Sequence, residues 1–122
     1  MFKALKPTLA ASIIAATFSF NTFAADVEKI HFLIPGGAGG GWDMTARGTG
    51  DVLVKSDIVE NVSFQNLSGG GGGKAIAHLI ETAQRQEDTL MVNSTPIVVR
   101  SLTGIFPQSF RDLTPVAATI AD

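Results

Sequence analysis

The chain has 122 residues, no cysteine and a formal net charge of −2. Without cysteine, the protein cannot form disulfide bonds, thiolate metal sites or a cysteine nucleophile. An apolar fraction of 45% is sufficient for the core of one small domain. The weakly acidic balance argues against a nucleic-acid partner, which requires clustered basic residues.

Residues 1–24 have the pattern of a cleavable secretory signal peptide. Met1–Lys6 carries two lysines and no acid, Thr8–Phe20 is apolar, and Thr22 and Ala24 place small side chains before the cleavage point. The alternative is an uncleaved membrane anchor, but an apolar stretch of about 13 residues is shorter than the roughly 20 that span a bilayer. We therefore expect a periplasmic protein with no stable membrane insertion after cleavage. Removing the two lysines changes the net charge from −2 to −4.

In residues 25–122, strand-like and helix-like segments alternate. Short apolar runs predict strands at Lys29–Ile34, Asn61–Leu67 and Thr89–Val92, and helices are predicted at Asp43–Lys55, Lys74–Arg85 and Thr95–Leu102. Another strand is expected to begin within Leu113–Ile120. This order favours an α/β fold with a parallel sheet, flanking helices and right-handed crossovers. Because the chain stops at this last segment, we expect residues 25–122 to be an incomplete domain from a longer protein.

Two glycine-rich stretches lie where a predicted strand ends and a helix begins. The first is Gly36–Gly41, interrupted once by alanine, and the second is Gly69–Gly73. In open parallel sheets, ligands bind outside the carboxyl ends of the strands. Glycine lets backbone N–H groups approach a ligand closely, and the first turn of a helix adds free donors and a positive dipole end. A flexible linker is the commoner interpretation of glycine runs, but it does not explain why both fall between a strand and a helix.

Carboxylate is the anion that the residues around these stretches favour. Trp42 stands where the dinucleotide pattern G-x-G-x-x-G requires glycine, and Ala75 stands where a P-loop requires serine or threonine. Peptide N–H groups together with the hydroxyls of Ser68, Ser94 and Thr95 can satisfy a carboxylate without a metal or a cofactor.

Five other side chains are candidates for roles at or near these stretches. Trp42 can supply an apolar wall and an indole donor. Asp43 has two compatible interpretations, as the N-cap of the helix or as an acceptor for a ligand hydroxyl or ammonium group. Lys74 is a candidate charge partner. His31 and His78 have no acidic or cysteine companion at ligand spacing, so structural roles are expected for both.

Three ordered motifs resemble a known family of bacterial receptors. Residues 35–47, with the sequence PGGAGGGWDMTAR, resemble the first ligand loop of the substrate-binding proteins of tripartite tricarboxylate transporters, which are related to the Bug-type periplasmic receptors. The Trp-Asp pair resembles the tricarboxylate-receptor branch. Residues 66–72 (NLSGGGG) are similar to the second loop of the family, and residues 110–117 (FRDLTPVA) are similar to the segment that crosses to the other domain.

This resemblance implies the first lobe of a two-lobed, Venus-flytrap receptor that delivers a carboxylated solute to a permease with one large and one small subunit. A second lobe would then be absent from this chain. Carried over by position, the ligand-binding residues are Gly36, Gly37, Ala38, Gly39, Gly40, Gly41, Trp42, Asp43, Ser68, Gly69, Gly70, Gly71, Gly72, Ser94 and Thr95. Two departures from the family pattern, Ser68 for proline and Gly70 for alanine, imply a looser second loop.

The leading hypothesis from the sequence is therefore a non-enzymatic periplasmic receptor for tricarboxylates such as citrate, present as a fragment. The alternatives are a secreted α/β enzyme that acts on a carboxylated substrate with Asp43 as general base, and a non-functional truncated remnant. All of them share one fold, so the fold does not distinguish them.

Overall fold

The computed structural model describes residues 27–85 and 87–119, so the predicted signal peptide lies outside the described residues. Three parallel strands form one open sheet in the order β2-β1-β3. Their bounds are Lys29–Ile34 for β1, Asn61–Asn66 for β2 and Thr89–Met91 for β3. The predicted parallel sheet is confirmed, and β2 and β3 each end one residue earlier than predicted.

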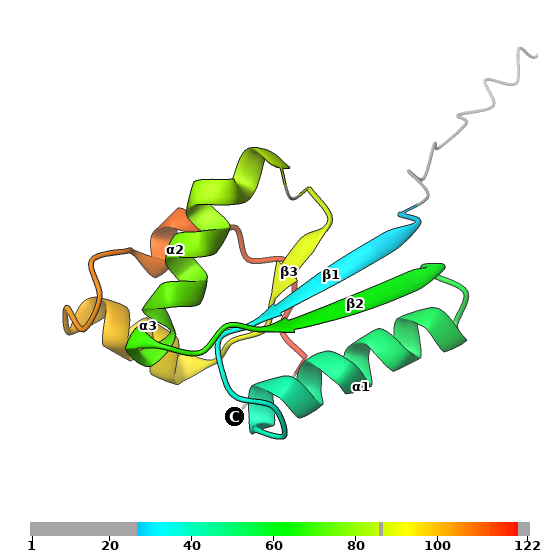
Figure 1. Cartoon of the computed structure of the whole chain (residues 1–122), viewed down its shortest axis with the longest axis horizontal. Helices are drawn as coiled ribbons and strands as arrows, with labels where there is room; N and C mark the ends of the chain where they lie inside the picture. Colours follow the sequence, from blue (N-terminus) through cyan, green and yellow to red (C-terminus); the bar gives the residue numbers. More distant parts are fainter. Residues whose placement is uncertain (1–26, 86, 120–122) are drawn as a thin grey trace, which may run out of the picture.

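Helices lie on both sides of this sheet. Helix α1 (Gly41–Lys55) lies on one side, and α2 (Gly73–Thr82) and α3 (Thr95–Leu102) lie on the other (Figure 1). Three short 3-10 segments, η1 (Gly70–Gly72), η2 (Ala83–Arg85) and η3 (Phe110–Asp112), complete the described elements. The protein is therefore an α/β structure with an open parallel sheet and flanking helices.

Two apolar clusters hold the layers together. Phe32, Ile34 and Ala46 form the first, between the sheet and α1. Ile76, Ile97 and Phe106 form the second, on the side of α2 and α3. Since successive side chains of a strand point to opposite faces, Phe32 and Ile34 face α1 while Leu33 between them faces the other side. The largest fully buried side chains all lie between the sheet and a helix layer: Phe32, Leu33, Ile34, Ile76 and Ile97.

Helix α1 differs from its prediction at its first residue. It begins at Gly41, two residues before Asp43, with Gly40 as N-cap, and it continues through Gly48 and Gly50 to Lys55. Gly50 is buried, and a Cβ atom there would lie 2.8 Å from the ring of Phe64. The glycine that weakens helix propensity is thus the residue that lets α1 approach the sheet closely.

The strand expected to begin within Leu113–Ile120 is not formed in the described part of that segment. Residues 113–119 form no regular element, and Val116 is 74% exposed. A strand needs a neighbouring strand to satisfy its backbone groups, and Pro115 cannot donate a hydrogen bond. Only Leu113 packs against the second apolar cluster.

Candidate functional site

Three loops meet at the carboxyl edge of the sheet, and the residues predicted to bind a ligand lie in these loops and in the first turns of the helices that follow them. The loop after β1 is joined to the loop after β3 because Trp42 Nε1 donates to Ser94 Oγ over 2.9 Å. The loop after β1 is joined to the end of β2 because Asn66 Nδ2 donates to the Gly36 carbonyl over 3.0 Å. Segments some thirty and fifty residues apart are thereby fixed side by side, as expected from parallel strands.

Each of the three helices begins at this edge without a side-chain cap. The N-cap residues are Gly40 for α1, Gly72 for α2 and Ser94 for α3, and no side chain of these residues caps its helix. The Ser94 hydroxyl accepts from Trp42 instead. The first N–H groups of a helix have no partner within the helix, but in α2 those of Gly73 and Lys74 donate to the Gly70 and Gly69 carbonyls, and Pro96 of α3 has no N–H. The edge therefore carries three positive dipole ends, and α1 is the helix that offers its first N–H groups.

The second loop has a backbone that only glycine adopts without strain. Gly69, Gly70, Gly71 and Gly72 have φ angles of 138°, 55°, 64° and 103°. Successive positive φ values turn the backbone N–H groups into a concave arrangement of the kind that binds anions. Arg100 Nη1 donates to the Gly71 carbonyl over 3.1 Å, which holds the loop against α3. The looseness inferred from the family pattern is therefore limited by packing, since a Cβ at Gly72 would lie 2.9 Å from Ile97.

The first loop is more open than the second. Gly39 has a φ of 79°, and a Cβ atom at Gly37, Gly39 or Gly41 would meet nothing within 4 Å. The Gly36 position is closed by the Trp42 ring, which would lie 3.2 Å from a Cβ. Residues 37–41, which are four glycines and Ala38, are all exposed. This loop therefore presents exposed backbone beside a partly buried indole ring.

Asp43 is neither the N-cap of α1 nor open to solvent. It is the third residue of the helix and is 4% exposed. Its carboxylate accepts from the Gly39 N–H at 2.9 Å, from Arg47 Nε at 3.0 and 3.1 Å, and from Asn66 Nδ2 at 3.0 Å. The N-cap interpretation is wrong because the backbone before Gly41 is extended at Gly40, and Asp43 instead reaches back one turn to fasten the glycine loop.

These contacts fix the charge of Asp43. The hydrogen bond from Arg47, followed by those from Gly39 and Asn66, holds the pKa of the Asp43 carboxyl well below its usual range, although burial opposes the shift. The same ion pair raises the pKa of Arg47. A carboxylate with so low a pKa is a weak base, and both of its oxygens already accept internal donors.

Arg47 and Asn66 complete the site, although the sequence motifs did not assign them a role. Besides its bonds to Asp43, Arg47 lies over the Phe64 ring with its guanidinium carbon 4.9 Å from the ring centroid. The signal for Arg47 was its position four residues after an aspartate on a predicted helix, a spacing that favours ion pairs. For Asn66, the available signal was its place at the end of a predicted strand.

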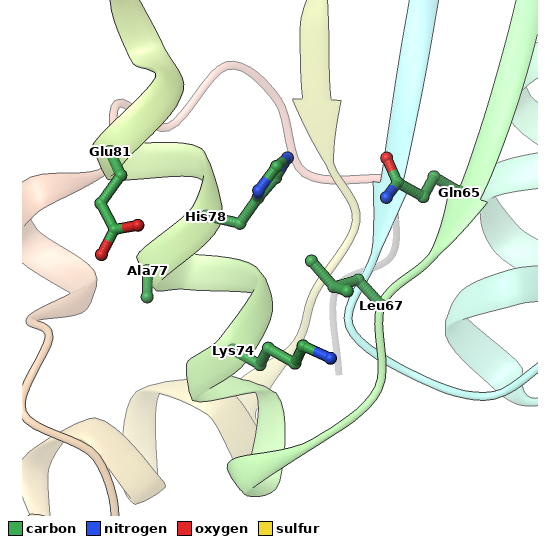
Figure 2. A pocket seen from close by; sticks show the side chains of 6 residues that line it. All are labelled: Gln65, Leu67, Lys74, Ala77, His78 and Glu81. Atoms are coloured by element: carbon green, nitrogen blue, oxygen red, sulfur yellow. The ribbon is translucent and has the colours of Figure 1, made fainter.

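A groove of about 430 Å³ adjoins the second loop. It lies between β2 and α2 and is lined by Gln65, Leu67, Lys74, Ala77, His78 and Glu81 (Figure 2). Lys74 belongs to the first turn of α2, and its aliphatic stem packs near Gly69. Lys74 therefore places a formal positive charge between the groove and the glycine loop, whereas the site predicted from sequence did not include the groove.

The sequence also raised the questions of a metal site, of a membrane span and of the roles of His31 and Thr95. Within residues 27–85 and 87–119, no three His, Cys, Asp or Glu side chains gather in a way that could hold a metal ion. No helix in the same residues has the length and apolar character of a membrane span.

His31 lies on the sheet, with Nδ1 at 2.7 Å from Ser63 Oγ and Nε2 at 3.3 Å from Gln65 Oε1. Thr95, at the start of α3, is exposed.

Comparisons of the chain with protein-family models, with curated proteins and with solved structures found no match.

Proposed function

We propose that this protein binds the carboxylate groups of a small solute at the carboxyl edge of its sheet. The observation that carries the proposal is the meeting of three helix N-termini, none with a side-chain cap, beside two exposed glycine loops. A carboxylate accepts several hydrogen bonds at once, and backbone N–H groups at helix N-termini supply such donors without a competing negative charge.

The charges around the edge are compatible with an anionic ligand. Asp43 is the acid closest to the first loop, but its charge is offset by Arg47 and its oxygens are occupied. Lys74 adds a positive charge beside the second loop. A ligand with two or three carboxylates can therefore place one group on each loop, which supports tricarboxylates such as citrate as the ligand class.

The cellular role that we propose follows from the resemblance described above. The chain is the first lobe of a periplasmic receptor, it leaves the cytoplasm by its signal peptide, and it delivers the solute to a permease with one large and one small subunit. Asp43 does not support the alternative of a secreted enzyme that uses it as general base on a carboxylated substrate, because a general base needs a free oxygen and a pKa near the working pH.

The proposal is tested by titrating the chain with citrate while the fluorescence of Trp42 is recorded. Trp42 is the sole tryptophan and lies in the first turn of α1. We expect a saturable change with citrate and other polycarboxylates, and no change with the neutral trimethyl ester of citrate. No response to any member of a carboxylate panel would contradict the proposal.

A matched pair of variants tests whether a backbone donor is responsible. Gly41→Pro removes the first N–H of α1 at a position where helices accept proline, and Gly41→Ala keeps that N–H. A Cβ atom at Gly41 would meet nothing within 4 Å. Loss of one hydrogen bond to a charged acceptor should weaken citrate binding about tenfold in Gly41→Pro. Equal affinities in the two variants would show that the Gly41 N–H does not contact the ligand.

A further inference from the structure

The outer edge of β2 is a continuous row of unpaired backbone groups in the described structure. β2 ends the sheet and pairs with β1 alone. The N–H groups of Asn61 and Leu67 donate toward β1, to Glu28 and Ile34. Because backbone groups alternate in direction along a strand, those of Val62, Phe64 and Asn66 point away from β1.

This edge has none of the features by which sheets prevent pairing with other chains. Asn61–Asn66 contains no charged residue and no proline, and its six residues pair with β1 in unbroken register. Lysine, proline, bulges and short strands are the usual protections of an edge strand, and an edge without them is a template for another strand.

A second copy of β2 fits this edge in antiparallel orientation. The outward groups belong to even-numbered residues, so a twofold axis through Phe64 pairs Phe64 with the partner's Phe64 and Val62 with the partner's Asn66. Both pairs exchange N–H and C=O groups that are unpaired in the single chain. The same register keeps α1 of both copies on one face of the joined sheet.

Helix α1 carries a complementary stripe beside this edge. Met44, Arg47, Asp51 and Val54 follow the i, i+3, i+7, i+10 spacing of one helix side, and this side faces β2 because Arg47 lies over the Phe64 ring. Met44 and Val54 are exposed apolar residues, at 68% and 36%. With the axis near Phe64, antiparallel helices place Arg47 opposite the partner's Asp51 and Met44 opposite the partner's Val54.

The spacing of the layers permits these helix contacts. α1 lies over both β1 and β2, so its axis is set back from the β2 edge by roughly half a strand spacing. With strands about 4.8 Å apart across the new pair, the two helix axes lie on the order of 10 Å apart, which is the distance of packed helices.

We infer that the β2 edge and the Met44–Val54 stripe form the interface of a twofold homodimer with one continuous sheet of both copies. A second copy is favoured over an unrelated peptide because the stripe is complementary to itself in charge and in apolar character. In this dimer the two carboxyl edges point in opposite directions, and the glycine stretches Gly36–Gly41 and Gly69–Gly73 lie outside the paired segment Asn61–Asn66. Arg47 and Asn66 belong both to the interface and to the candidate site, but the inference rests on the β2 edge and on α1 and needs no ligand.

Analytical ultracentrifugation of the chain tests the stoichiometry. We expect a concentration-dependent monomer–dimer equilibrium. Val62→Pro removes an outward N–H without affecting the β1 ladder and should raise the dissociation constant about tenfold or more. Asp51→Arg should also weaken the dimer, whereas Glu81→Arg, the same charge change on α2, should not. A monomer at every soluble concentration would overturn the inference, and so would a dimer unaffected by Val62→Pro and Asp51→Arg.

Disulfide cross-linking tests the register even if Val62→Pro fails to fold. The chain has no cysteine, so all cross-links come from introduced residues. In the proposed register Ser63 lies opposite the partner's Gln65 as a non-hydrogen-bonded pair, with Cα atoms about 4.5 Å apart, which a disulfide can bridge. Oxidation of Ser63→Cys/Gln65→Cys should give a covalent dimer. Asn61→Cys/Ser63→Cys should not, and cross-linking of that control alone would contradict the register.

Discussion

Asp43 joins three elements at the carboxyl edge of the sheet through one buried carboxylate. Its carboxylate is almost fully buried and accepts from a loop N–H, a helix guanidinium and a strand amide. The three donors belong to the first loop, to α1 and to β2. Asp43 therefore fixes the relative positions of three elements that border the proposed site.

The stability of the protein should depend on pH through Asp43. Because the folded-state pKa of Asp43 is depressed, the carboxylate contributes stability above the unfolded-state pKa of about 3.9 and loses it as the pH falls toward the folded-state pKa. Asp43→Asn should therefore lower Tm clearly at pH 7, and the difference from the parent should shrink below about pH 4. Thermal melts across this pH range are the measurement.

Asp51→Asn is the matched control for that experiment, with all melts recorded at a protein concentration at which the chain is monomeric, because Asp51 also belongs to the proposed dimer interface. Asp51 lies on the same helix and has an exposed ion pair with Lys55 at 3.4 Å. Exposed pairs of this type contribute about 0.3–0.5 kcal/mol. A Tm difference of the same size and pH dependence in Asp51→Asn and Asp43→Asn would contradict the role assigned to Asp43.

The glycines of the two loops should respond differently to alanine. Gly72 has a φ of 103°, and its Cβ would lie 2.9 Å from Ile97, so Gly72→Ala combines backbone strain with overpacking. We expect a loss of about 2–4 kcal/mol in the free energy of unfolding. At Gly37 the φ angle is not positive and an added Cβ would contact nothing within 4 Å, so Gly37→Ala should change the free energy of unfolding by no more than about 0.5 kcal/mol. Urea denaturation of both variants checks this contrast, and equal effects would contradict it.

At the scale of elements, the contact of α1 with the sheet depends on one missing side chain. The Phe32 and Phe64 rings stack with centroids 5.5 Å apart, and Gly50 lies directly against them. The aromatic pair therefore sets how closely the helix approaches.

Gly50 and Gly48 provide opposite predictions within the same helix. Gly50→Ala must displace Phe64 or Phe32 and should destabilise the protein by about 1–3 kcal/mol, even though alanine favours helix. Gly48→Ala enters open space and should stabilise it by up to about 1 kcal/mol. Chemical denaturation of the two variants gives both values. A stabilising Gly50→Ala would show that the packing is looser than described.

The strands and helices were predictable from sequence where the pattern was local. Alternating apolar runs identified β1, β2 and β3, and helical spacing identified α2 and α3. The start of α1 was predicted two residues too late. Aspartate is a common N-cap, so Asp43 marked the predicted start, whereas in the structure Gly40 occupies the N-cap position without a side-chain hydrogen bond. The last predicted strand failed because strand formation depends on a partner, which a local pattern does not contain.

For the molecule as a whole, the meeting of the glycine loops at one edge of the sheet was predictable, but the side-chain contacts between these loops were not. Glycines between strands and helices indicated the carboxyl edge, because topology alone brings such loops together. The bonds of Asn66 to Gly36 and Asp43, and of Trp42 to Ser94, join residues distant in sequence and depend on side-chain geometry in the folded state. The glycine stretches are thus the part of the proposed site that could be identified from the sequence.

The central claim is that backbone N–H groups of the glycine loops bind carboxylates, and amide NMR measures it most directly. When the ¹⁵N-labelled chain is titrated with citrate, we predict saturable downfield shifts of the amide protons of Gly37, Ala38 and Gly41 in the first loop and of Gly69, Gly70 and Gly71 in the second. The N–H groups of Gly39, Gly40 and Gly72 already donate to Asp43, Gly37 and Gly69. The neutral trimethyl ester should leave the responding amides unchanged, and Gly48 and Gly104 serve as glycine controls elsewhere in the chain. Absence of shifts in both loops, or shifts confined to the groove residues Gln65, Ala77 and His78, would contradict the claim.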